Sequence, residues 1–285
     1  MSRRREIGNR LSALSDIAGI MSAMKGLALM ETRILMEFML SQRSMVAGIE
    51  AAAADFLASH AEFVPPPGPS RELCVLVGSE QGFCGDFNET LLTRMEALCR
   101  EKDAPVRWVV VGRRLAGRMG ERACTELALP GAVVADEVPA VLLRLTRELG
   151  RLLARDELTD FWLSALYHCE ASGDIRLRRL LPLRDLPAPS RVQPYPPELN
   201  LPPAEFLRGL IGHHLHAALN EVLYSSLMAE NRQRQAHMDR ALQRLDEDTA
   251  RLRLAYNTQR QEEITEEIEV ILLSADMLVE PGEMP

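Results

Sequence analysis

The chain lacks any run of 18 consecutive apolar residues, although hydrophobic residues make up 47% of its 285 positions. A membrane-spanning helix needs about 20 consecutive, predominantly apolar residues, so we expect none. The first residues are basic, but polar residues interrupt the apolar core that a secretory signal would need; these are Gly8, Asn9, Arg10, Ser12, Ser15 and Asp16. The pattern predicts a soluble protein.

Paired cysteines are also lacking. The five cysteines are an odd number and lie far apart, mostly within apolar runs: Cys74, Cys84, Cys99, Cys124 and Cys169. Small disulfide-stabilised domains have even, closely spaced sets, whereas buried thiols are typical of a reducing compartment. We therefore expect free thiols and a cytoplasmic location.

The chain has no excess of positive charge. Its 33 basic and 41 acidic residues give a formal net charge of -8. Binding to nucleic acid or to anionic lipid depends on clustered positive charge, so we expect no nucleic-acid partner.

A catalytic constellation is missing as well. The glycine-containing segment 78–85 (GSEQGFCG) is followed by Asp86, whereas a phosphate-binding loop has Lys and then Ser or Thr at that point. Cys84 has no histidine nearby to activate it. Three neighbouring histidines have no acidic or cysteine ligand at a suitable spacing; they are His213, His214 and His216. We expect a structural turn at 78–85 and no catalytic residue, cofactor or metal.

Proline is absent from residues 204–278, and the only glycines there, Gly209 and Gly212, lie near the start. Such a segment predicts one helix of about 100 Å, too long for a compact domain of this size. One apolar seam comprises Met238, Leu242, Leu245, Thr249, Leu252, Tyr256 and Gln259. A second seam, shifted by one residue, comprises Ile264, Ile268, Ile271, Ala275 and Leu278.

A second long helix is predicted at residues 4–58, because proline is absent until Pro65. Its seam comprises Leu14, Ile17, Met21, Met24, Ala28, Leu35, Phe38, Met45 and Ile49, with Glu31 and Gln42 in the gaps. Steps of three and four residues are typical of a left-handed coiled coil. Since the two helices lie at opposite ends of the chain, we expect an antiparallel coiled coil around an inserted domain. The alternative is that each helix packs on a globular core.

The segment between the two helices has a different pattern. Strands are predicted at 72–77, 106–111, 131–135, 160–169 and 175–183, and helices at 88–100, 113–121 and 139–154. Residues 172–174 form a hairpin turn between the last two strands. Alternating strands and helices predict an open α/β sheet, Rossmann-like in kind. The predicted domains are an N-terminal coiled-coil helix at 1–60, the sheet domain at 71–184 and a C-terminal coiled-coil helix at 204–280.

Four segments carry a resemblance to one family. Residues 254–278 (LAYNTQRQEEITEEIEVILLSADML) resemble the C-terminal signature of the gamma subunit of F-type rotary ATP synthases. The upstream matches are Glu230, Arg234, Met238 and Ala241; the turn matches at Gly82, Cys84, Gly85 and Asn88; the N-terminal segment matches at Ile20, Ala23, Met24 and Ala28. All four occur in family order, from about Arg3 to Leu278. The chain resembles a divergent member, because Met21, Glu31, Val270, Ser274 and Met277 depart from the usual pattern.

The resemblance implies a central rotor shaft without chemistry of its own. In this family, the coiled coil fills the axis of a ring of alpha and beta subunits, and its asymmetry places three identical sites in different states. Ring contacts are implied for Arg260, Gln261, Thr265 and Glu267, with Met24 and Lys25 facing the same region. Glu230 and Arg234 are implied to lie at the foot, toward the epsilon subunit and the membrane c-ring. The resemblance also implies a peripheral location on the cytoplasmic face of the inner (plasma) membrane, and coupling to protons or sodium ions.

Two alternatives stay open at this point. One is a coiled-coil adaptor with an inserted α/β domain, unrelated to rotary enzymes. The other is an α/β enzyme or nucleotide-binding protein with helical arms, against which the missing phosphate loop argues. On their own, the polar residues near Tyr256 also fit an ordinary solvated helix face.

Overall fold

The structure is a computed structural model that describes residues 3–64, 71–102, 105–120, 125–155, 161–184, 186–188 and 198–278. Two helices account for nearly half of the chain, α1 (Arg3–Ser59) and α5 (Pro203–Leu278). Both lie within two residues of the bounds predicted from the sequence. Their contacts divide the chain into two units, residues 1–26 with 238–285 and residues 27–237. The three predicted domains stay a prediction.

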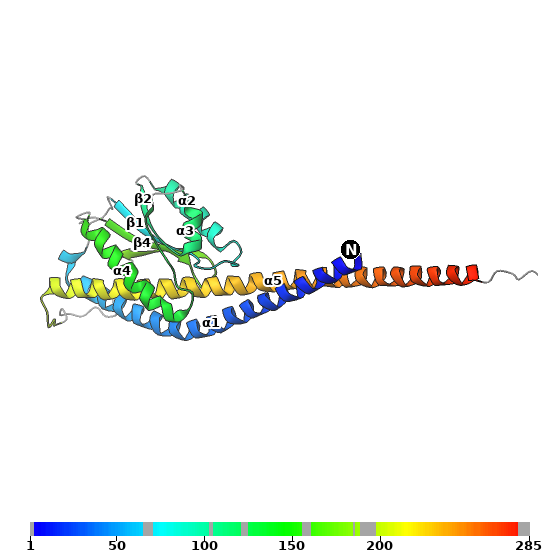
Figure 1. The fold of residues 1–285 in the computed structure, drawn as a ribbon. Coiled ribbons are helices and arrows are strands. Elements are labelled where there is room, and N and C mark those ends of the chain that lie inside the picture. Colours follow the sequence, from blue (N-terminus) through cyan, green and yellow to red (C-terminus); the bar gives the residue numbers. More distant parts are fainter. Residues whose placement is uncertain are drawn as a thin grey trace, which may run out of the picture. The chain divides into compact units, whose positions relative to one another are not determined.

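The larger unit contains a five-stranded sheet (Figure 1) with the strand order β3-β2-β1-β4-β5. Its elements follow in chain order: η1 (Ala61–Phe63), β1 (Arg71–Val77), α2 (Phe87–Glu101), β2 (Val106–Val111), α3 (Arg113–Met119), β3 (Thr125–Leu129), η2 (Ala135–Glu137), α4 (Val138–Arg155), β4 (Phe161–His168) and β5 (Ile175–Leu181). Strands β1 to β4 are parallel, and β5 pairs antiparallel with β4. The predicted open α/β sheet is confirmed.

Alternate residues of the central strands face two separate cores. Cys74, Leu76, Trp108 and Val110 belong to the core that α2 and α3 cover. Their neighbours along β1 and β2 pack instead against α1, α4 and α5; these are Leu73, Val75, Val77, Val109 and Val111. Because successive side chains of a strand point to opposite faces, a strand buried on both faces appears in the sequence as an unbroken apolar run.

The strand predicted at 131–135 is wrong. The structure places β3 at Thr125–Leu129, and Ala135 begins the short η2 helix. As an edge strand, β3 is largely exposed and has no apolar run to reveal it. The apolar residues after it belong to a connection in which the Gly131 N–H bonds to the Glu80 carboxylate rather than to a strand.

The predicted seam of α1 is partly wrong. Ile17, Phe38 and Met45 are exposed, whereas the next residue in each case, Ala18, Met39 or Val46, is half-buried or buried. The observed buried positions keep a seven-residue repeat, Ala28, Leu35 and Gln42 with Thr32, Met39 and Val46. In a coiled coil this repeat decides which residues face the partner. The prediction followed the largest apolar side chains instead.

The seam of α5 is confirmed up to Gln259, since Met238, Leu242, Leu245 and the later members are half-buried or buried. Within the smaller unit the same repeat continues to Glu263. The predicted second seam finds no cover in the described chain, because Ile264, Ile268 and Ile271 are exposed.

Candidate functional site

The turn at 78–86 connects β1 to α2 and is held in a single shape. Gly78 has no room for a side chain, because a Cβ would lie 2.5 Å from Leu115. Gly85 has a positive φ of 62°, which glycine adopts without strain. Asn88 closes the turn, since its Oδ1 accepts the Ser79 N–H at 3.0 Å and its Nδ2 donates to Ser79 Oγ at 2.7 Å.

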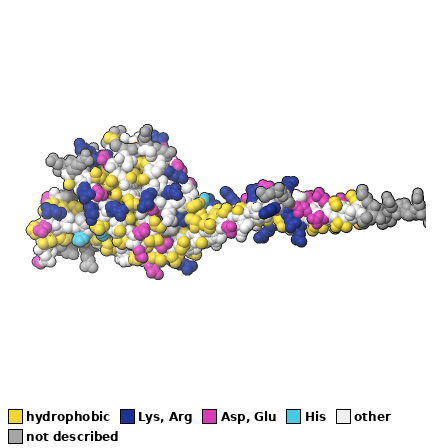
Figure 2. Space-filling model, in the orientation of Figure 1, with side chains coloured by type: hydrophobic (Ala, Val, Ile, Leu, Met, Phe, Trp, Pro, Cys, Tyr) yellow, Lys and Arg dark blue, Asp and Glu magenta, His cyan; other side chains and the backbone are white. Residues whose placement is uncertain are grey.

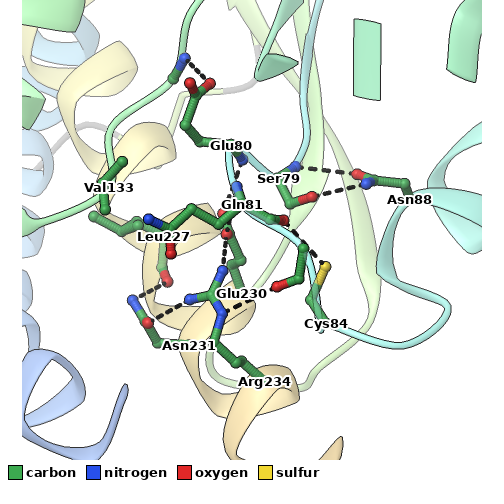
Figure 3. A network of polar contacts seen from close by, with 12 residues as sticks. Ser79, Glu80, Gln81, Cys84, Asn88, Val133, Leu227, Glu230, Asn231 and Arg234 are labelled. Atoms are coloured by element: carbon green, nitrogen blue, oxygen red, sulfur yellow. Dashed lines mark hydrogen bonds and ion pairs between the residues drawn. The ribbon is translucent and has the colours of Figure 1, made fainter. Parts of the chain in front are cut away.

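Glu230 of α5 binds the backbone of this turn (Figure 3). Its carboxylate accepts the N–H groups of Glu80 and Gln81, each at 3.4 Å. In a phosphate-binding loop such N–H groups would bind the anion, but here the chain supplies its own carboxylate. The expected structural turn at 78–85 therefore has a physical role, which is to join β1 to α5.

Arg234 completes the pair one helical turn later. Its guanidinium bonds to the Glu230 carboxylate, to Asn231 Oδ1 at 2.8 Å and to the Gly82 carbonyl at 3.3 Å. Glu230 is 3% exposed and Arg234 5%. Burial raises the pKa of Glu230, although the charge and hydrogen bonds of Arg234 oppose that rise. A buried ion pair is tolerated when its remaining polar groups are hydrogen-bonded, as they are here.

The carboxylate of Glu80 extends the network to the next two loops. It accepts the N–H of Arg113 at 2.9 Å and that of Gly131 at 2.7 Å, and it pairs with Arg113 Nε at 2.8 Å. Arg113 follows β2 and Gly131 follows β3. The polar junction, defined here as Ser79, Glu80, Asn88, Glu230 and Arg234, thus connects three loops at the carboxyl edge of the sheet to α5.

A cleft of about 560 Å³ opens beside this junction, at the carboxyl ends of β1 and β4. Ligands of open α/β sheets bind at such a crevice. Here α5 lies across it, and polar contacts tie the walls together. Gln233 donates to Asp86 Oδ1 at 2.9 Å, and the Arg232 guanidinium bonds to the Glu170 carbonyl. On the wall, His168 stacks on Phe87 and donates from Nε2 to its carbonyl at 2.8 Å.

The smaller unit is an antiparallel pair of helices that is closed by polar contacts. Arg4 pairs with Glu263 at 3.0 Å and donates from Nε to the Tyr256 hydroxyl at 3.3 Å. Further along, Lys25 forms an ion pair with Asp239. The 15 residues of α5 after Glu263 extend about 22 Å, and no helix within the described part of the chain pairs with them.

This unpaired end of α5 is apolar and acidic at once. Among its described side chains, Ile268, Val270, Ile271, Leu272 and Leu273 are each more than half exposed. Figure 2 shows hydrophobic and acidic side chains together toward this end of α5, after a stretch where basic side chains gather. Exposed apolar patches of this kind are typical of surfaces that bind another protein.

The predicted site residues fall into three places. Arg260, Gln261, Thr265 and Glu267 all lie exposed on the last described turns of α5. Met24 and Lys25 are not with them, because Lys25 lies opposite Asp239, 21 residues or about 32 Å before Arg260 along α5. Glu230 and Arg234 are buried in the polar junction. Contacts of these eight residues with other subunits stay a prediction.

Three junction residues were not predicted as site residues: Ser79, Glu80 and Asn88. An acidic residue three positions after a buried strand, at the carboxyl edge of a sheet, is the signal that could have indicated Glu80. The sequence could not indicate its partners, because Arg113 and Gly131 lie 33 and 51 residues further on.

Cys84 and the three histidines were considered above for catalysis or metal binding, and the structure shows the surroundings of each. Burial raises the pKa of the Cys84 thiol, which makes it a poor nucleophile. His214 is buried with its Nε2 3.4 Å from Glu50, whereas His213 and His216 are exposed. Among the described residues, no three His, Cys, Asp or Glu side chains are close enough together to hold a metal ion.

Helix α1 is long and apolar enough to cross a membrane by length and composition, and only 6% of its most apolar stretch is buried within the chain. The criterion of an unbroken apolar run missed this stretch, because polar residues interrupt it. One such helix is weak evidence for a membrane span.

Comparisons with known proteins point to a single family. The family model described as ATP synthase matches residues 3–278. The ATP synthase gamma chain of Chlorobaculum tepidum is 26% identical over 98% of this chain and 99% of its own. That of Moorella thermoacetica is 25% identical over 98% and 100%, and that of Geobacter metallireducens 28% over 73% and 74%.

Solved structures share the fold. A chain of the Euglena gracilis mitochondrial ATP synthase (OSCP/F1/c-ring, rotational state 3) has a TM-score of 0.60 and 14% identity, covering 99% of this chain and 98% of its own. A chain of the Tetrahymena thermophila mitochondrial ATP synthase central stalk and c-ring has a TM-score of 0.58 and 15% identity, covering 78% and 99%. With the family model matched over almost the whole sequence, this chain belongs to the gamma-chain family of ATP synthases.

Proposed function

We propose that this protein is the central rotor shaft of an F-type ATP synthase. In this role it couples ion-driven rotation of a membrane ring to the conformational cycle of the catalytic sites. The observation that carries the proposal is the unpaired end of α5, an exposed apolar helix on a chain of this family. The adaptor alternative has no support in the comparisons.

The end of α5 is the part proposed to enter the ring of alpha and beta subunits. Exposed apolar side chains there would lie against the inner wall of the ring, and Arg260, Gln261, Thr265 and Glu267 would supply polar contacts to it. A shaft can bias a catalytic site only by contacting its conformations differently. An end of α5 that exposes both charged side chains and leucine and isoleucine side chains suits such differential contact.

The sheet domain is proposed to bind the epsilon subunit and the c-ring. Solved relatives bear titles that name a central stalk, F1 and a c-ring. The polar junction supports this division of roles, because its buried ion pair holds the sheet on α5 against a twisting load. Torque that reaches the sheet would pass to the helix through Glu230 and Arg234.

Three finer features belong to the proposal. The subunit performs no chemistry itself, it couples protons or sodium ions through the membrane ring, and it is peripheral, on the cytoplasmic face of the inner (plasma) membrane. The free thiols of the described cysteines suit a reducing, cytoplasmic location.

The test uses the double variant Arg260→Ala with Gln261→Ala. The chain is co-expressed with the alpha and beta subunits of its own organism, and assembly and ATPase activity are measured. Removal of the polar contacts is expected to lower assembly or ATPase activity about tenfold, on the scale of an interface residue worth about 1 to 2 kcal/mol. Gln243→Ala with Arg244→Ala, an adjacent exposed pair on the same helix, is the matched control. Failure of the unchanged chain to co-purify with the ring would refute the proposed function.

A further inference from the structure

The strands β4 and β5 form a hairpin that touches both long helices. The predicted turn at 172–174 is present, with the Gly173 N–H bonded to the Cys169 carbonyl at 2.8 Å and a φ of 74° at Gly173. β5 is an edge strand of the sheet and contains three arginines, Arg176, Arg178 and Arg179. Arginine on an edge strand commonly discourages pairing with other chains, but Arg178 has a different set of contacts.

Arg178 bonds to one carboxylate from each long helix. Its Nη2 lies 2.7 Å from Glu50 of α1, and its Nη1 lies 2.5 Å from Glu221 of α5. All three side chains are at least three-quarters buried. Burial lowers the pKa of Arg178, but the hydrogen bonds and charges of Glu221 and Glu50 outweigh it and raise the pKa. Only a guanidinium can bridge two carboxylates in this way, because its donors lie in a planar fork.

Glu170, just after β4, repeats the arrangement with opposite charge. Its buried carboxylate pairs with Arg43 of α1 and accepts the Ser225 hydroxyl of α5, while its N–H donates to Ser225 Oγ at 3.2 Å. Arg43 and Glu50 lie seven residues apart on α1, which is two turns or about 10 Å. The hairpin therefore holds both helices at two points on the same side.

We propose that Arg178 is a positioning residue that binds α1 and α5 to the sheet domain together, so that both helices turn with the sheet. This inference rests on the proposed rotor function for its mechanical consequence. The polar junction binds α5 alone, through Glu230 and Arg234. Without the hairpin contacts, a load on the sheet would still reach α5 through two buried charged side chains. It would reach α1 only through apolar packing and one hydrogen bond, from the Ala135 N–H to Glu31 at 3.2 Å.

The first measurement uses the full chain alone. Amide hydrogen exchange in α1 from Arg43 to Phe56 is compared between the unchanged chain, Arg178→Met and the isosteric Glu50→Gln. We expect protection to fall about tenfold in both variants, since local opening follows the lost contacts. Arg94→Met breaks an ion pair within α2 and is the control, with no change expected in α1. Unchanged protection in Glu50→Gln and Arg178→Met would overturn the proposed positioning role of Arg178.

The second measurement uses the assembled enzyme in vesicles and reports ions pumped per ATP hydrolysed. Arg178→Met is expected to lower this ratio about threefold, within the range of coupling changes that mutations remote from a site produce. Arg178→Lys, which keeps the charge but not the fork, should restore only part of it. A ratio equal to that of Arg94→Met would overturn the mechanical role even if the melting temperature falls. If the unchanged chain forms no active complex, the proposed function fails. Hydrogen exchange then decides by itself whether Arg178 binds α1 and α5 to the sheet domain.

Discussion

Two regions of α5 carry similar residues in opposite surroundings. Glu230 and Arg234 are almost fully buried and bonded to the turn after β1, whereas Glu267 and Arg260 are exposed on the last described turns. Both pairs belong to segments that resemble the same family. A match to a family motif therefore does not tell whether a residue serves the fold or a partner.

The difference lies in what faces each segment. Around Glu230, the carboxyl edge of the sheet supplies N–H groups and a carbonyl, so that each buried polar group has a partner. Glu263 lies opposite Arg4, in the first turn of α1. Beyond Glu263, no described part of the chain covers α5. Substitutions in the first region should therefore act on stability, and those in the second on assembly. Three pairs of variants test the difference in stability. Each pair compares a buried residue in or beside the polar junction with an exposed residue of α5.

The largest effect is expected from Glu230→Ala. It leaves the Arg234 guanidinium buried without its carboxylate, and loss of one partner of a buried ion pair costs about 3 to 5 kcal/mol. Chemical denaturation of the full chain measures the free energy of unfolding. Glu267→Ala, the exposed counterpart, should change it by less than about 0.5 kcal/mol. Equal losses in the two variants would show that the buried contact is not what distinguishes the regions.

A smaller effect is expected from Asn88→Ala. The substitution leaves the buried Ser79 N–H without an acceptor, which costs about 1 to 3 kcal/mol. Asn257→Ala, at an exposed position of α5, is the matched control and should be close to neutral. The same denaturation experiment compares the two. An unchanged free energy of unfolding in Asn88→Ala would mean that the turn keeps its shape without the Asn88–Ser79 hydrogen bonds.

The smallest effect is a dependence on pH. Burial lowers the pKa of His168 in the folded chain, so its contribution to stability is fully present above the usual pKa of about 6.5. As the pH falls below that value, the unfolded chain binds the proton first, and stability falls by at most about 1.4 kcal/mol per pH unit from this group. His214 acts in the same direction, because burial lowers its pKa too.

The pH dependence is measured by denaturation between pH 7.5 and about 5, where histidine titrates. His168→Phe keeps the stacking on Phe87 but cannot bind a proton, so the loss of stability toward acid should become shallower. His216→Gln, at an exposed position, should leave the slope unchanged. A slope that changes in His216→Gln and not in His168→Phe would contradict the assignment to the buried region.

The fold could be predicted where one periodicity ran without interruption. The helices α1 and α5, the buried strands β1 and β2 and the β4–β5 hairpin all lie close to their predicted bounds. The edge strand β3 could not be predicted, because it buries almost no side chain and so leaves no apolar signal. The prediction placed Phe38 on the α1 seam because it is a large apolar residue, but the buried residue is Met39. Phe38 stays exposed and stacks on Tyr224, with 5.5 Å between the ring centroids.

The site was less predictable than the fold. The family segments pointed to the right helix, but the partners of Glu230 are 149 and 150 residues away and no spacing rule connects them. The sequence also could not tell which residue of α5 lies opposite Lys25, which is Asp239; that Met24 and Lys25 face the ring stays a prediction. The pairing of Lys25 with Asp239 depends on where α1 begins opposite α5, which the contact of Arg4 with Glu263 decides.

The sequence by itself determined two long helices, a sheet inserted between them and membership of one family, because periodicity and motif order are properties of neighbouring residues. Only the tertiary structure decided which polar residues of α5 are buried and which stay exposed. Burial depends on what the chain brings to each helix face, and that comes from residues more than a hundred positions away.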